Sequence, residues 1–388
     1  MSVSDTSQAE IELRQKPGRV DTSLSEHLRR QIAAMHPAYF AMAMATGIVA
    51  IACHTLGLHE FAGGLSWVNI LAYPALCVML IVRVIWFPGR VVADLRDHAR
   101  APGYFTIVAA TAVMGSQAAL LHNQLAVAQV LWWMALVLWG ACTYTIFAML
   151  TINERKPTLD KGINGGWLVA VVATQSVCVL GCTLDGLILA DRDTMLFILM
   201  CFWLGGGMLY LWIIGLIFYR YMFFRFSPQD LMPPYWINMG SVAISTLAGT
   251  LLANQAETSV LLGSMRPFIL GLTVMFWATA TWWIPMLLLL GIWRHRSQNV
   301  RFSYDPLYWG LVFPLGMYSV CTYRLAAVLD ATFLLWIARV FVVAAASVWL
   351  LTFLGLARRV LFVILLAFRR PHLAIVVNNQ TDQATIRA

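Results

Sequence analysis

Charged residues are scarce in this sequence. Aspartate, glutamate, lysine and arginine together make up 11% of its 388 residues, whereas 60% of the residues are hydrophobic. A soluble core of this size could not bury that much apolar surface. The composition therefore excludes an ordinary soluble domain and predicts an all-α polytopic membrane protein.

Motifs of catalysis and metal binding are also missing. The sequence contains no H-E-x-x-H, no G-x-S-x-G and no phosphate-binding loop, and its eight histidines are scattered. All seven cysteines fall within apolar runs, where a small buried hydrophobe is a better explanation than a disulfide or a ligand. Residues 1–35 lack the apolar centre of a signal peptide. We therefore expect no enzyme activity, no metal and no cofactor.

Ten apolar runs follow the polar N-terminal segment, and each approaches the ~20 residues that cross a bilayer core of ~30 Å. They predict a ten-helix domain over residues 36–356, between cytoplasmic tails at 1–35 and 357–388. A short amphipathic helix over Glu26–Met35 is expected to lie on the membrane surface. The predicted spans are 37–57, 66–87, 103–121, 125–150, 166–189, 194–218, 235–254, 266–291, 306–328 and 332–355.

The basic residues are distributed very unevenly over the loops. Of the 26 lysines and arginines, only Arg192, Arg266 and Arg324 fall on one side, and Arg83 and Arg339 fall within spans. The positive-inside rule then predicts that both termini are cytoplasmic. We expect the chain to be a multi-pass protein of the cytoplasmic (inner) membrane. Basic residues in short loops do not form a nucleic-acid groove, despite the net charge of +8. We expect Arg83 to snorkel, and Arg339 to contact another helix or subunit.

The same short motif stands at the start of every odd-numbered span. Each opens with proline or glycine followed closely by aromatic residues, as in Pro37-Ala38-Tyr39-Phe40 and Pro306-Leu307-Tyr308-Trp309. An interfacial aromatic belt accounts for the aromatic residues but not for their recurrence at every second span. The repeat therefore predicts five parallel helical hairpins around an axis normal to the membrane.

Small and polar residues recur at helical spacing along the odd-numbered spans. Such side chains either join helices or line an aqueous path. Because five odd spans carry them while tryptophans concentrate on the even ones, we expect an inner ring around a central pore. His54 is also the candidate for proton coupling. The candidate pore-lining residues are Thr46, Gly47, His54, Gln117, Thr174, Gln175, Ser241, Ser245, Gly310 and Met317.

Four of these spans carry motifs that resemble the tellurite-resistance/dicarboxylate transporter family. The motifs lie at Met42–Ala50, Thr111–Gln117 and Gly166–Ser176, and at Trp309–Pro314, which is similar to the family's W-x-x-x-F-P pattern. The family includes bacterial tellurite-resistance proteins, fungal malate permeases and sulfite pumps, and plant slow anion channels. The resemblance implies a ten-helix anion pore, a homotrimer, and a gate in which Phe313, followed by Pro314, occludes the pore.

These observations together predict the transport of small anions across a lipid bilayer. C4-dicarboxylates of the malate type are the first expectation, and efflux of sulfite or tellurite-type oxyanions, or an anion channel, is the alternative. A ligand-binding membrane sensor or an intramembrane enzyme would need ionisable residues clustered at one depth, and the sequence shows no such cluster.

Overall fold

The structure is a computed structural model that describes residues 24–188, 191–298 and 304–385. The chain divides into two units, Met1–Met35 and His36–Ala388, which are described separately. In the first unit the described helix is α2 (Leu24–Ala34), where an amphipathic helix was expected over Glu26–Met35. Its contact with a membrane surface stays a prediction.

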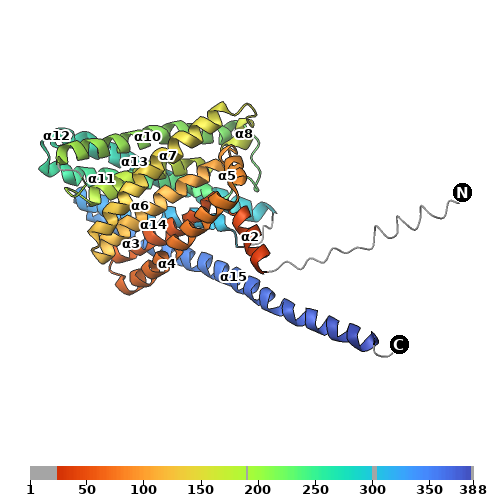
Figure 1. Cartoon of the computed structure of the whole chain (residues 1–388). Coiled ribbons are helices and arrows are strands. Elements are labelled where there is room, and N and C mark those ends of the chain that lie inside the picture. Colours follow the sequence, from red (N-terminus) through yellow and green to blue (C-terminus); the bar gives the residue numbers. More distant parts are fainter. Residues whose placement is uncertain (1–23, 189–190, 299–303, 386–388) are drawn as a thin grey trace. The chain divides into compact units, whose positions relative to one another are not determined.

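In the described residues of the second unit, ten helices are long and apolar enough to cross a membrane (Figure 1). The five from the odd spans are α3 (Ala41–Thr55), α6 (Phe105–His122), α9 (Val169–Thr183), α11 (Ile237–Gln255) and α14 (Trp309–Val328). The other five are α4 (His59–Trp86), α7 (Leu125–Ile152), α10 (Arg192–Phe223), α13 (Arg266–Gln298) and α15 (Leu335–Thr385). The short helices between them are α5 (Pro88–Leu95), α8 (Leu159–Gly162) and α12 (Val260–Gly263).

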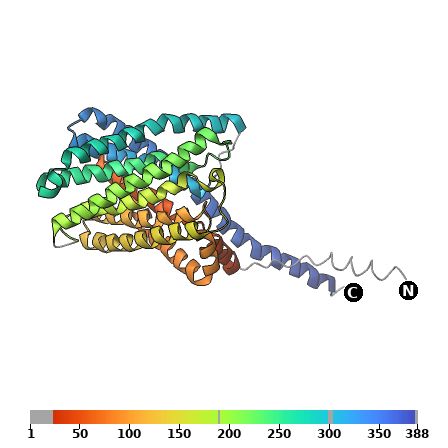
Figure 2. The same cartoon turned by 90° about the horizontal axis from the view of Figure 1, so that it is seen from above.

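The odd-span helices form a closed inner ring. Along the chain α3 contacts α6, α6 contacts α9, α9 contacts α11, α11 contacts α14, and α14 returns to α3. Each even-span helix lies outside, against its own hairpin partner and the next inner helix. Most of the long helices of this unit run roughly along one direction in both views (Figures 1 and 2). Between 72% and 89% of the most apolar window of each inner span is buried, against 22% to 39% for the outer spans. The ring of five hairpins predicted from the repeat is confirmed.

A 3₁₀ turn precedes each inner helix, and these turns are formed by the proline- or glycine-aromatic motifs. Proline suits this position because a helix leaves its first backbone donors unpaired in any case. Each turn contacts the next, so they close a second ring at the N-terminal end of the inner helices. Glycine is required where they meet: a Cβ on Gly165 would lie 2.5 Å from the carbonyl oxygen of Pro234. The turns are η1 (Pro37–Phe40), η2 (Ala101–Tyr104), η3 (Gly165–Leu168), η4 (Pro233–Trp236) and η6 (Pro306–Tyr308).

Left-handed residues end four of the five inner helices. Gly57, Asn123, Gly186 and Asp330 have φ between 52° and 85° and turn the chain into the following outer helix. The turn near Gly186 ends α9 at Thr183, earlier than the predicted span 166–189. In the fourth hairpin, between α11 and α13, η5 (Ala256–Thr258) and α12 make the connection. At the other end of the chain, α15 continues to Thr385, through most of the segment predicted as a tail.

Outer helices are bonded to the inner helix of the next hairpin through side chains. The indole N–H of Trp349 on α15 donates to the hydroxyl of Thr46 on α3 at 3.0 Å, and Trp277 on α13 donates to Thr322 on α14 at 3.0 Å. Trp203 on α10 donates to the carbonyl of Ser245 on α11 at 2.9 Å. Buried indole N–H groups need such partners. Tryptophans on the outer helices are thus hydrogen-bonded to hydroxyl and carbonyl oxygens of the inner helices.

Arg83 corrects one expectation from the sequence. It was expected to snorkel to the interface, but its side chain is only 1% exposed. Its Nη2 donates to Oδ2 of Asp94 on α5 at 2.6 Å, and its Nη1 donates to the hydroxyl of Tyr104 at 3.3 Å. Arg100 donates to the other oxygen of Asp94 at 2.6 Å. Because α5 folds back after α4, this cluster joins the first hairpin to the turn that begins the second.

Candidate functional site

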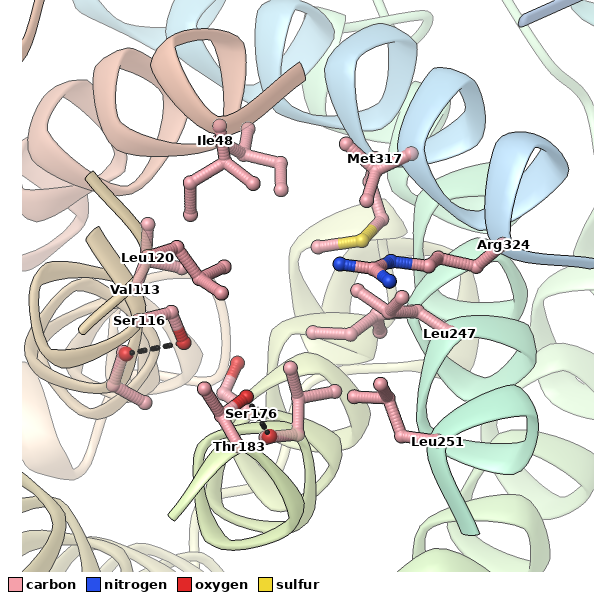
Figure 3. Close-up of a pocket in the computed structure, with 15 residues that line it drawn as sticks. Ile48, Val113, Ser116, Leu120, Ser176, Thr183, Leu247, Leu251, Met317 and Arg324 are labelled. Atoms are coloured by element: carbon pink, nitrogen blue, oxygen red, sulfur yellow. Dashed lines mark hydrogen bonds between the residues drawn. The ribbon is translucent and has the colours of Figure 1, made fainter. Parts of the chain in front are cut away.

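A cavity of about 190 Å³ lies on the axis of the inner ring, towards the C-terminal ends of its helices. All five inner helices contribute to its wall, and their side chains point into the space between the ribbons (Figure 3). We call it the C-end cavity. Its lining comprises Ile48, Ile51, Ala112, Val113, Ser116, Leu120, Ser176, Val179, Thr183, Ile244, Leu247, Leu251, Met317, Val320 and Arg324.

Arg324 is the single charged side chain in that lining. It projects from α14, and its guanidinium reaches into the cavity near Met317 (Figure 3). A guanidinium is positively charged and carries only hydrogen-bond donors. The rest of the wall is aliphatic apart from a thioether and three hydroxyls, so the C-end cavity is an apolar space with one fixed positive charge.

A second cavity, of about 170 Å³, lies at the N-terminal end of the ring. We call it the N-end cavity. The 3₁₀ turns η1, η2, η3, η4 and η6 all contribute to its wall, together with the first residues of the inner helices. Its polar lining includes His36, Arg100 and Asn164. The side chains of His36 and Asn164 accept hydrogen bonds from the N–H groups of Ala38 and Gly166, and so cap η1 and η3.

His36 should make the stability of the protein depend on pH. Burial lowers the pKa of His36 from its ordinary 6.5 to about 4, and the nearby Arg100 guanidinium acts in the same direction. Because the folded pKa lies below the unfolded one, the stabilisation is present above pH 6.5 and is lost as pH falls towards 4. Between pH 7.5 and 5 we expect a loss of ~2 kcal/mol.

Thermal unfolding in detergent at the two pH values checks this expectation. His36→Asn is the matched control, because asparagine also caps a helix but does not titrate. The pH dependence of the variant should be weaker by about that amount. Equal pH dependence in both proteins would contradict the assignment to His36.

Phe313 lies between the two cavities. Gly310, three residues before it, lines the N-end cavity, and Met317, four residues after it, lines the C-end cavity. These spacings put all three residues on one face of α14. The side chain of Phe313 is fully buried. Pro314 packs on Gly240 of α11, where a Cβ would lie 2.7 Å from its Cγ.

The structure places the other polar candidates away from the axis. Thr46 accepts from Trp349, Thr174 accepts from Trp139 on α7 at 2.8 Å, and the amide of Gln175 donates to the carbonyl of Trp203 at 2.9 Å. These three side chains therefore face outer helices. Among the described residues, neither cavity is lined by Thr46, Gly47, His54, Gln117, Thr174, Gln175, Ser241 or Ser245.

Gln117 and Gly47 belong to a polar network at the contact between α3, α4 and α6. The amide of Gln117 donates to the hydroxyl of Ser66 at 2.7 Å and accepts from Asn69 at 3.0 Å. A Cβ on Gly47 would lie 2.8 Å from the amide nitrogen of Asn69, so glycine leaves room for this network. His54 lies outside it, with its Nδ1 3.3 Å from that of His59.

Ser241 and Ser245 bond to their own helix, to the carbonyls of Ile237 and Ser241, each at 2.8 Å. Gly310 and Met317 are therefore the two candidates that line a cavity. Sequence reasoning missed Arg324, although a signal for it was present. Arg324 follows Met317 by seven residues, which is two helical turns, and so continues the face that carries Gly310 and Phe313.

Comparison with known proteins identifies the family. Residues 34–357 match the family described as "SLAC1: Voltage-dependent anion channel". The chain is 34% identical to an uncharacterized membrane protein of Mycobacterium tuberculosis over 148 residues, 38% of this chain and 75% of that protein.

Two more distant relatives cover more of the chain. An uncharacterized transporter of Methanocaldococcus jannaschii is 23% identical over 74% of this chain and 83% of its own length. The "Sulfite efflux pump SSU1" of Trichophyton rubrum is 23% identical over 83% of this chain and 90% of its own length. With its ten helices and its match over residues 34–357, the chain belongs to the voltage-dependent anion channel (SLAC1) family of multi-pass membrane transporters and channels.

Proposed function

We propose that this protein moves small anions along the axis of its inner ring, and that Phe313 occludes the path between the N-end and C-end cavities. The observation that carries the proposal is the arrangement of the two cavities. Each is lined by all five hairpins, and the two meet α14 one turn before and one turn after Phe313. Pro314 and Gly240 hold this part of α14 against α11.

The charges around the cavities favour anions over cations. Among the described residues, no aspartate or glutamate lines either cavity, whereas Arg324 lines one, and Arg100, which is paired with Asp94, lines the other. The inner helices also point their N-terminal ends, which carry partial positive charge, at the N-end cavity. An anion there meets weak, distributed attraction, which permits it to leave again.

Sulfite and related oxyanions are the substrates that we place first. The name of the Trichophyton relative supports this class, since that relative aligns with most of the chain. C4-dicarboxylates such as malate, expected from the sequence, are the second candidate. By the distribution of basic residues both termini are cytoplasmic, so the N-end cavity would open to the cytoplasm. The inner-membrane location and the homotrimer also stay predictions.

Thiol modification in the C-end cavity tests whether the anion path follows the axis. In a variant without native cysteines, Ser176→Cys places a thiol in the cavity wall. A water-soluble, membrane-impermeant methanethiosulfonate should label this thiol in proteoliposomes, and we expect sulfite flux to fall about tenfold because the adduct fills part of the cavity.

Ser319→Cys is the matched control for that experiment. Ser319 also lies on an inner helix, but it is not in the lining of the C-end cavity and donates to the carbonyl of Ala338 on α15 at 2.7 Å. It should neither label nor change flux. If the flux of sulfite, malate and chloride into proteoliposomes with the parent protein is no greater than into empty vesicles, the proposed function is wrong. Full labelling of the Ser176→Cys variant without loss of flux would place the path elsewhere.

A further inference from the structure

Three arginines fall on the side of the membrane domain that has few basic residues, and Arg324 differs from the other two. Arg192 forms an ion pair with Asp185 at 2.8 Å, and Arg266 forms one with Glu257 at 2.8 Å. Within the part of the chain that the structure describes, Arg324 has no carboxylate partner and no hydrogen bond, although it lines the C-end cavity. Arg324 is partly exposed, and its guanidinium faces a largely apolar wall, where a counter-charge would stabilise it.

The hydroxyls in the cavity wall cannot supply donors to an anion in the observed arrangement. Ser116 donates to the carbonyl of Ala112 at 3.1 Å, Ser176 to that of Val172 at 2.7 Å, and Thr183 to that of Val179 at 2.9 Å. Because a carbonyl oxygen can only accept, each hydroxyl must donate its proton to the carbonyl of its own helix in these hydrogen bonds. The hydroxyl oxygens present lone pairs, which leaves Arg324 as the donor-bearing side chain of the lining.

The helix dipoles explain why a cation is needed at this end. The inner helices point their C-terminal ends, with partial negative charge, towards the C-end cavity, and their N-terminal ends towards the other. An anion that leaves the favourable N-end cavity therefore meets repulsion beyond Phe313. The guanidinium of Arg324 offsets that repulsion inside the cavity.

We propose that Arg324 is the charge-selecting residue of the C-end cavity and that it accepts one singly charged oxyanion at a time. This inference rests on the proposed anion path and deepens it. A doubly charged anion would place its second charge against aliphatic walls and hydroxyl lone pairs, where nothing in the lining neutralises it. For diprotic acids such as sulfurous or malic acid, the transported species would then be the monoanion.

Flux and binding measurements on Arg324→Gln test the proposal. Nitrate serves as the singly charged probe and sulfate as the doubly charged one, in proteoliposomes and, for binding, by thermal shift in detergent. The parent protein should pass nitrate well and sulfate poorly. Arg324→Gln should raise the half-saturating nitrate concentration roughly tenfold, the effect of losing a charge-assisted hydrogen bond. It should also move the reversal potential in a KCl gradient towards zero and abolish the nitrate-dependent thermal shift.

Two variants serve as controls. Arg266→Gln makes the same charge change on the same side of the domain, in an exposed ion pair outside the cavity lining, and should behave like the parent. Arg324→Lys keeps the charge and should retain the reversal potential, even if Arg324→Gln fails to fold.

The outcomes separate this inference from the proposed function. The parent protein could pass no anion and still show a nitrate-dependent thermal shift that is lost in Arg324→Gln. That result would overturn the transport function but would support an anion-binding site at Arg324. Parent protein that passes nitrate, with an unchanged reversal potential and half-saturation in Arg324→Gln, overturns the role of Arg324. Equal passage of sulfate and nitrate overturns the single-charge limit.

Discussion

Phe313→Ala is expected to raise anion flux about tenfold or more, equivalent to at least ~1.4 kcal/mol removed from the barrier. The side chain of Phe313 is fully buried between cavities of about 170 and 190 Å³. Its removal would join these two spaces along the axis. Ion flux through proteoliposomes, or single-channel recording in planar bilayers, measures the change for chloride, nitrate and sulfite.

A matched control is needed because a large buried side chain is lost. Truncating a buried phenylalanine to alanine typically costs ~3–5 kcal/mol of stability. Phe105 on α6 is also buried, but it packs on Phe147 of the outer helix α7. Phe105→Ala should lose similar stability without a gain in flux. Unchanged flux in folded Phe313→Ala, or an equal gain in Phe105→Ala, would reject the occlusion by Phe313.

The ring was predictable because its signals repeat at every hairpin. Proline or glycine with aromatics marked the start of each inner helix, and the structure forms a 3₁₀ turn at all five of these places. The division into inner and outer helices was also readable, since outer helices carry tryptophan and inner helices carry hydroxyls and amides. Five repetitions of a weak pattern outweigh the ambiguity of any one occurrence.

The direction in which the polar side chains face was not predictable from the same pattern. We expected Thr46, Thr174 and Gln117 to line the pore, but each bonds to an outer helix. In a bilayer an indole or amide without a hydrogen-bond partner is destabilising. The polar groups on the inner helices therefore form hydrogen bonds with the outer helices that surround them. The axis is left with aliphatic side chains, which periodicity alone cannot distinguish from a packed core.

Non-local pairing explains why the role of Arg83 was also hidden. Its partner Asp94 lies on α5, and only the fold of the chain after α4 brings the two together. A comparable cluster forms at the end of α10, where Arg220 donates to the carbonyl of Ile163 at 2.7 Å and pairs with Asp230 at 3.3 Å. Buried arginines at the ends of these two outer helices thus anchor the 3₁₀ turns around the N-end cavity.

Asp94→Ala should destabilise the protein far more than the loss of an exposed carboxylate does. Asp94 is 6% exposed and accepts from both Arg83 and Arg100 at 2.6 Å. Its removal leaves the guanidinium of Arg83, which is 1% exposed, without a counter-charge. Breaking a buried ion pair from one side costs ~3–5 kcal/mol. Thermal unfolding in detergent should show the loss, whereas Glu154→Ala, which changes an exposed carboxylate, should be nearly neutral.

A double-mutant cycle with Arg83→Met distinguishes a lost pair from general damage. If the cost arises from the uncompensated charge, the variant that carries both changes should be more stable than Asp94→Ala alone, because methionine fills much of the arginine volume without a charge. Additive losses would mean that the two side chains do not act as a pair. Since this cluster joins α4 to the turn η2 in the wall of the N-end cavity, recovery should extend to anion flux as well as to unfolding.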